Sequence, residues 1–143
     1  MKYLVLAGMI LASAVAAARV DRPAKEVAVT VNRTPANDGK LMYASYCSSC
    51  HGMDGKGNGP TAPALLSRPA DLTALSRNNH GKFPLESVKS ALEFGAHGPV
   101  HGTVQMPKWG PILDEMDGAY AGQLRGMQRI VALSGYLEAI QQK

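Results

Sequence analysis

Cys47-Ser48-Ser49-Cys50-His51 is the stretch of sequence that decides the fold of this chain. A Cys-x-x-Cys-His run is the attachment signature of a c-type haem. Each thiol can add to one haem vinyl group, because the two intervening residues match the spacing of the two vinyls. The adjacent His51 can then reach the iron as an axial ligand. The sequence therefore predicts one covalent haem c, attached through Cys47 and Cys50.

A protein that only carries electrons needs a second axial ligand, and a thioether opposite a histidine favours the reduced iron. Six of the seven methionines lie in the expected signal peptide, beside the haem motif, or at linker and core positions (Met1, Met9, Met42, Met53, Met116 and Met127). Met106 lies far from His51 in a loop rich in proline and glycine, and Pro107 stiffens that loop. Trp109 offers an apolar plate and one N–H donor for a haem propionate. We expect Met106 to be the distal ligand; an ordinary buried methionine is the alternative.

Residues 1–18 have the pattern of a secretory signal peptide: Lys2, an apolar stretch of small residues, and alanines at the cleavage position. The apolar stretch is short for a membrane span, which needs about 20 residues, although an uncleaved anchor is an alternative. Residues 19–36 are expected to be a leader or linker, and residues 37–143 the haem domain. Export predicts a bacterial periplasmic location. Membrane association through a partner or an uncleaved N-terminus is the alternative.

Composition narrows the classes of function further. The formal charge of +4 and the absence of dense Lys/Arg runs argue against a nucleic-acid partner and fit steering toward an acidic protein. In a dithiol oxidoreductase the Cys-x-x-Cys pair would lie in a βαβ pattern, and that function would not explain why His51 follows the second cysteine. A structural zinc site would need four ligands, and nothing near the cysteines completes the set.

Hydrophobic periodicity predicts an all-α domain. A first helix begins at Asn37 or Asp38 and runs into the cysteines, and a short helix covers about 71–77. Pro84 opens a third helix that Gly95 ends, and a final helix covers roughly 119–140. The intervening stretches 52–69 and 95–111 are expected to be loops.

The motifs together resemble a monohaem class I c-type cytochrome over about residues 37–142. In that family a glycine and an aromatic residue lie eight and four positions before the first cysteine and pack against an aromatic residue of the last helix. Gly39, Tyr43 and Tyr136 hold those places. The distal Met-Pro-x-Trp-Gly and the stretch 68–73 are similar to bacterial oxidase- and dehydrogenase-associated domains.

The resemblance implies a small cytochrome c fold, with three to five helices around one covalently attached haem in residues 37–143. It also implies that the Pro63 carbonyl, in Pro63-Ala64-Leu65, accepts the Nδ1–H of His51. The expected function is one-electron transfer with His51 and Met106 as axial ligands, in a respiratory or dehydrogenase chain, and not catalysis. Partners would be an oxidase, reductase or dehydrogenase, with the protein a monomer or a subunit of a membrane complex. A haem protein with an open iron position is the further alternative.

Several other polar residues have less specific surroundings. His97 and His101 lie in a segment that Gly98 and Pro99 should keep from being helical, so we interpret them as loop residues near the haem edge; a role as a rival ligand or in metal binding is the alternative. His80 lies in a turn and is expected to be exposed. Three cations could pair with haem propionates or be solvated surface charges (Arg68, Arg77 and Lys108).

Overall fold

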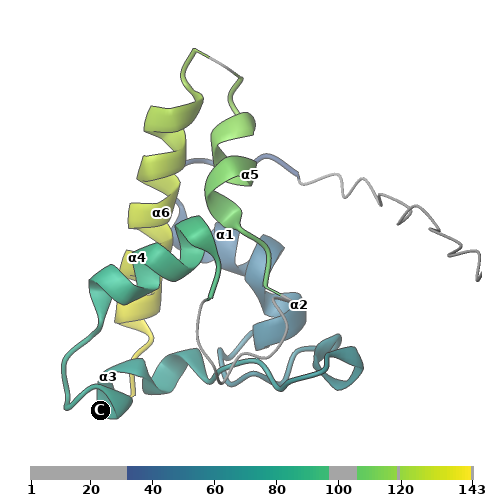
Figure 1. The fold of residues 1–143 in the computed structure, drawn as a ribbon, viewed down its shortest axis with the longest axis vertical. Coiled ribbons are helices and arrows are strands. Elements are labelled where there is room, and N and C mark those ends of the chain that lie inside the picture. The colour runs from purple at the N-terminus through teal and green to yellow at the C-terminus, as the bar shows by residue number, and fades with distance from the viewer. Residues whose placement is uncertain (1–31, 97–105, 119, 143) are drawn as a thin grey trace, which may run out of the picture.

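The computed structural model describes residues 32–96, 106–118 and 120–142, and these residues form helices and loops without any strand (Figure 1). The prediction of an all-α fold is confirmed. The expected signal peptide and both His97 and His101 lie outside the described residues. Within the described residues, no helix has the length and apolar character needed to cross a bilayer.

The N-terminal helix carries the haem motif at its end. It begins with α1 (Gly39–Met42), continues through a π-helical turn η1 (Tyr43–Cys47), and ends with α2 (Ser48–His51). Asp38 caps its start, since its Oδ1 accepts a hydrogen bond of 2.8 Å from the N–H of Leu41. Gly52 ends the helix with φ +80°, a conformation that glycine adopts without strain. The predicted start of the first helix is therefore confirmed.

The remaining elements follow as short helical turns and three longer helices. They are η2 (Ala62–Ala64), η3 (Leu72–Ala74), α3 (Leu75–Asn78), α4 (Leu85–Phe94), α5 (Trp109–Glu115) and α6 (Gly122–Ala139). If α1 to α2 counts as one helix, the structure lies at the upper end of the expected three to five. Gly95, with φ +89°, ends α4 as predicted.

Helix α5 corrects the expectation of a loop from 95 to 111, because it begins at Trp109. Glycine and proline in its first turn resemble a loop signal, although proline is tolerated at that end of a helix. Tertiary packing decides that this segment forms a helix. Gly110 lies so close to the Glu93 backbone that a Cβ would crowd it, and Leu113 is fully buried.

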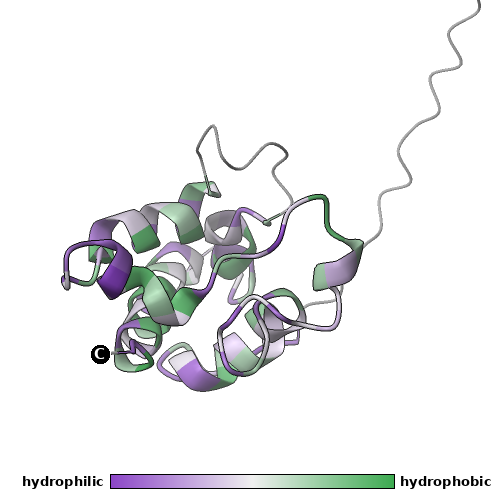
Figure 2. Cartoon of the chain, turned by 90° about the horizontal axis from the view of Figure 1, so that it is seen from below, coloured by the Kyte–Doolittle hydropathy of each residue, from purple (hydrophilic) through white to green (hydrophobic). Residues whose placement is uncertain are grey.

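Helix α6 packs against α1, α5 and α4, and α4 crosses in front of α6 in the view of Figure 1. Glycines make these contacts possible: Gly39 faces the Ala132 backbone, and Gly122 and Gly126 face Asp114. The rings of Tyr43 and Tyr136 are 5.2 Å apart, as the family pattern predicts. In Figure 2, hydrophobic and hydrophilic residues alternate along the longer helices, and α4, for example, buries Val88 and Leu92 of its apolar face.

The packed part of the chain begins before residue 37, because two residues of the expected linker are buried, Thr34 and Ala36. The side chain of Arg129, which is 3% exposed, donates from Nη2 to the Thr34 carbonyl at 3.2 Å. Its Nη1 donates to the carboxylate of Asp117, two residues after the end of α5. Arg129 on α6 thus joins the N-terminal segment to the α5–α6 connection.

Gly39→Ala should lower the free energy of unfolding by about 1–3 kcal/mol, because the new methyl overlaps the Ala132 carbonyl and forces α1 away from α6. Gly135→Ala is the matched control: it lies in α6 with open space around a Cβ. That change should stabilise the protein by up to about 1 kcal/mol through helix propensity. Urea unfolding of both variants checks the pair, and equal effects would contradict the close contact.

Arg129→Met should lower the free energy of unfolding by about 1–3 kcal/mol, because the buried Thr34 carbonyl loses its donor. The exposed Arg125→Met, on the same helix, should change it by about 0.5 kcal/mol or less. The hydrogen bond from Arg129 lowers the pKa of Asp117. A lowered folded-state pKa gives stability above the unfolded pKa that is lost as pH falls through the folded value. Arg129→Met should therefore flatten the acid side of the stability profile, measured by urea unfolding at several pH values.

Candidate haem-binding site

The end of the N-terminal helix presents the three residues of the haem motif. Cys47 is the last residue of η1, and Cys50 and His51 lie in α2 one helical turn later. The chain after Gly52 folds back over α2. The N–H groups of Gly57 and Gly59 donate to the carbonyls of His51 and Cys50, at 2.8 and 3.1 Å. These bonds satisfy carbonyls that a helix end would otherwise leave open.

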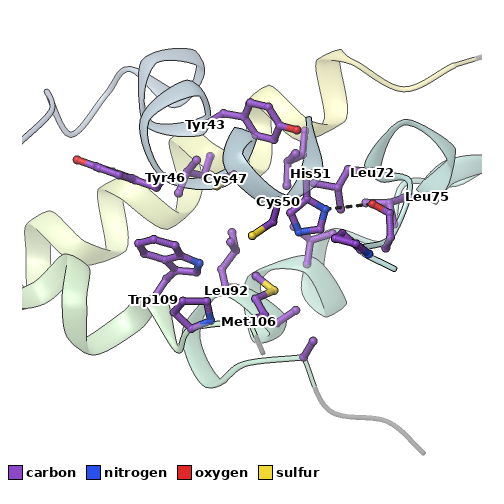
Figure 3. Close-up of a pocket in the computed structure, with 18 of the residues that line it drawn as sticks. Tyr43, Tyr46, Cys47, Cys50, His51, Leu72, Leu75, Leu92, Met106 and Trp109 are labelled. Carbon is purple, nitrogen blue, oxygen red and sulfur yellow. Dashed lines mark hydrogen bonds between the residues drawn. The ribbon is translucent and has the colours of Figure 1, made fainter. Parts of the chain in front are cut away.

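A cavity of about 310 Å³ lies between this helix, the 65–75 segment, α4, α6 and the start of α5. Five of the six predicted cofactor residues line it (Cys47, Cys50, His51, Met106 and Trp109). Figure 3 shows Cys50 and His51 reaching the space from one side and Met106 from the other. Much of the remaining wall is aliphatic (Leu65, Leu72, Leu75, Val88, Leu92, Leu133 and Leu137).

The ring of His51 is held by a carbonyl other than the one that the family pattern implies. Its Nδ1 lies 3.0 Å from the Ala70 carbonyl oxygen, the contact drawn as a dashed line in Figure 3. Pro63 is exposed and does not line the cavity, so the structure corrects the expected Pro63 contact. The physical reason is that the chain between 65 and 70 returns to the cavity after η2 and brings a later carbonyl to the ring.

Burial lowers the pKa of His51, although the hydrogen bond to Ala70 acts in the opposite direction. A lowered pKa keeps the imidazole neutral over a wider range, and only the neutral ring can ligate a metal. With Nδ1–H donated to Ala70, Nε2 is the nitrogen left to bind. The ring is thus prepared for ligation by its surroundings.

The two cysteines are unlike a reactive dithiol pair. Both are free, and burial followed by the proximity of Cys50 raises the pKa of Cys47 to about 12. Redox-active Cys-x-x-Cys pairs instead lower the pKa of their nucleophilic thiol. Among the described residues, no group of three or more His, Cys, Asp or Glu side chains is placed so that it could hold a metal ion.

Tyr46 is a wall residue that the sequence reasoning missed. Its ring stacks on Trp109 with centroids 5.6 Å apart, and both residues line the cavity. Its hydroxyl lies 2.5 Å from the Asn32 carbonyl and 2.8 Å from the Thr34 hydroxyl. An aromatic residue directly before the first cysteine was the one available signal. The N-terminal segment therefore contacts a residue of the cavity wall.

Some of the other residues considered in the sequence line the cavity, and others lie outside it. Of the three cations suggested as propionate partners, Arg68 lines the cavity, whereas Arg77 and Lys108 do not. His80 is exposed in a turn with φ +55°, as predicted. Tyr43 also reaches the cavity, and its hydroxyl donates to the Gly52 carbonyl at 2.7 Å. Burial raises the pKa of Tyr43, so the hydroxyl keeps its proton.

This donor set fits a c-type haem. Two thiols one helical turn apart can form two thioethers, an adjacent neutral imidazole can ligate iron, and the wall is mostly aliphatic and aromatic. Met106 adds a soft sulfur donor on the other side of the same space.

Comparison with known proteins gives one family. The family model described as "Cytochrome C oxidase, cbb3-type, subunit III" matches residues 34–121. The match spans the haem motif, the Ala70 segment, Met106 and α5. It starts at Thr34, which is the first buried residue among those that the structure describes. No curated protein and no solved structure matches the chain.

Proposed function

The chain belongs to the family of cytochrome c oxidase, cbb3-type, subunit III, and is therefore a c-type cytochrome; from this premise we propose that it is a one-electron carrier with His51 and Met106 as axial ligands. The observation that carries the proposal is the convergence of Cys47, Cys50, His51 and Met106 on one apolar cavity. A haem c bound there would supply an iron that alternates between Fe(III) and Fe(II).

The chain's own residues then have distinct tasks. Cys47 and Cys50 hold the cofactor covalently, so it stays bound in a small domain. His51 offers a neutral nitrogen with a fixed ring orientation, and Met106 offers a soft sulfur that favours the reduced state. The aliphatic wall excludes water, which limits the reorganisation that accompanies each electron transfer. Trp109 can donate its indole N–H to a propionate.

The setting that we propose is the bacterial periplasm, reached through the signal peptide at residues 1–18. The name of the matching family favours a role as a subunit of a membrane oxidase complex over a freely diffusing carrier. An oxidase, reductase or dehydrogenase would then be the partner. A catalytic haem protein would need an open iron position, which ligation by Met106 would close.

Replacing both Cys47 and Cys50 by serine should abolish covalent attachment, because no thioether can form. Haem in the variant should pass into acidified organic solvent, whereas haem in the unchanged protein should stay with the polypeptide. Ser48→Ala plus Ser49→Ala is a matched control, since it changes the intervening residues and keeps both thiols. Extractable haem in the unchanged protein would contradict the proposed attachment.

Met106→Ala should lower the reduction potential and allow carbon monoxide to bind the ferrous iron, because the soft axial ligand is lost. Absorption spectra with and without carbon monoxide, and a redox titration, measure both effects. Met53→Ala is the control, because Met53 is exposed and does not line the cavity. Carbon monoxide binding by the unchanged protein would instead favour the open-iron alternative.

A further inference from the structure

We propose that Asp71 is a positioning residue for the haem ligand His51, and that Ala70-Asp71-Leu72 takes the proximal role that the family pattern gives to Pro63-Ala64-Leu65. The inference rests on the proposed function, because it concerns the ligand of a bound haem. The observation that supports the inference directly is the 3.0 Å contact between His51 Nδ1 and the Ala70 carbonyl oxygen.

Asp71 fixes the chain directly after that carbonyl. Its Oδ1 accepts hydrogen bonds from the N–H of Thr73 at 2.9 Å and from the Thr73 hydroxyl at 2.6 Å. Thr73 is itself buried at 4% exposure. The two hydrogen bonds to Thr73 set the turn that begins η3. They thereby determine the direction of the peptide that carries the Ala70 oxygen.

The same turn is tied to the loop that follows His51. The N–H of Leu72 donates to the Gly55 carbonyl at 2.7 Å, and the N–H of Gly57 donates to the His51 carbonyl at 2.8 Å. Gly57, at φ +72°, lies so close to the Pro69 carbonyl that a Cβ would overlap it. Short backbone contacts therefore hold His51 and the Ala70 carbonyl in fixed positions relative to one another.

The C-terminus supports the turn from the other side. Gln141 donates from Nε2 to the Leu72 carbonyl at 2.7 Å, and the N–H of Gln142 donates to the Thr73 carbonyl at 2.9 Å. Leu72 also lines the cavity, as the leucine of a Pro-x-Leu pattern would. Residues 70 and 72 thus supply both parts of that pattern, an acceptor carbonyl and an apolar contact two residues later.

Pro63 lacks these features. It lies in the single turn η2, is exposed, and does not line the cavity. Proline followed by x-Leu twelve residues after the histidine matches the family pattern in sequence, and Leu65 does line the cavity, but the carbonyl that contacts His51 is that of Ala70. The consequence for function is that the Nδ1–H bond, which makes a ligating imidazole more basic, depends on the turn at Asp71.

The first experiment identifies the acceptor in the unchanged holoprotein. Ala70-Asp71 is the one Ala-Asp pair in the sequence, so alanine labelled at the carbonyl carbon together with ¹⁵N-aspartate marks the Ala70 carbonyl uniquely. With histidine also labelled with ¹⁵N, the His51 Nδ1 of the diamagnetic reduced state should show a ¹⁵N–¹³C coupling across the hydrogen bond to that carbon. A coupling to carbonyl-labelled proline instead would overturn the proposal.

The second experiment tests the role of Asp71. Asp71→Ala should accelerate exchange of the His51 Nδ1 proton by about tenfold, the factor expected when a hydrogen bond of ordinary net strength is lost. It should also raise the reduction potential, because a less basic imidazole stabilises Fe(III) less. Asp71→Asn removes the charge but keeps an acceptor for Thr73, so it should leave the exchange rate nearly unchanged. This variant therefore distinguishes the effect of the hydrogen-bonded turn from the effect of the carboxylate charge.

Pro63→Ala is the matched control and should change neither quantity. If Pro63→Ala accelerates exchange and Asp71→Ala does not, the proximal role returns to residues 63–65. Failure of the unchanged protein to attach haem would count against the proposed function itself. A holoprotein with the opposite pattern of variants would overturn only the inference about Asp71.

Discussion

The close contact between Gly39 and the Ala132 backbone is the constraint on which the rest of the structure depends. It lets the N-terminal helix approach α6 closely, and the Tyr43 and Tyr136 rings then meet beside it. The end of this helix, with Cys47, Cys50 and His51, consequently faces the cavity to which Leu133 and Leu137 of α6 contribute. A larger residue at position 39 would move the cofactor site together with the helix.

The proximal side of the site is built mostly from backbone. Glycines allow the 52–59 loop to lie against α2 and against the 69–72 segment, so carbonyl and N–H groups from distant positions meet around His51. Backbone acceptors in a mostly apolar cavity are well suited to this task, because they carry no net charge and cannot titrate. Burial lowers the pKa of the imidazole and so favours its neutral form, and the Ala70 carbonyl sets its orientation.

The other walls are linked to segments far from the haem motif. Trp109 begins α5, which is held by the glycine contacts of α4 and α6, and it stacks on Tyr46 of the N-terminal helix. Tyr46 in turn contacts Asn32 and Thr34 through its hydroxyl. The N-terminal segment is therefore joined to the cavity wall through Tyr46 as well as to α6 through Arg129.

The sequence by itself determined the features that depend on local chemistry. The Cys-x-x-Cys-His spacing, the Asp38 cap and the glycine at the end of α4 follow from residues whose meaning is set by near neighbours or by a fixed spacing. The Gly39–Tyr43–Tyr136 contact was instead implied by the resemblance to class I c-type cytochromes. The choice of Met106 as distal ligand also came from sequence, and the structure places it in the cavity. Only the tertiary structure decided the Ala70 acceptor, the start of α5 at Trp109, the stacking of Tyr46 and the burial of Arg129. Each of these depends on a close approach between segments distant in sequence, and a backbone carbonyl has no residue identity through which a motif could reveal it.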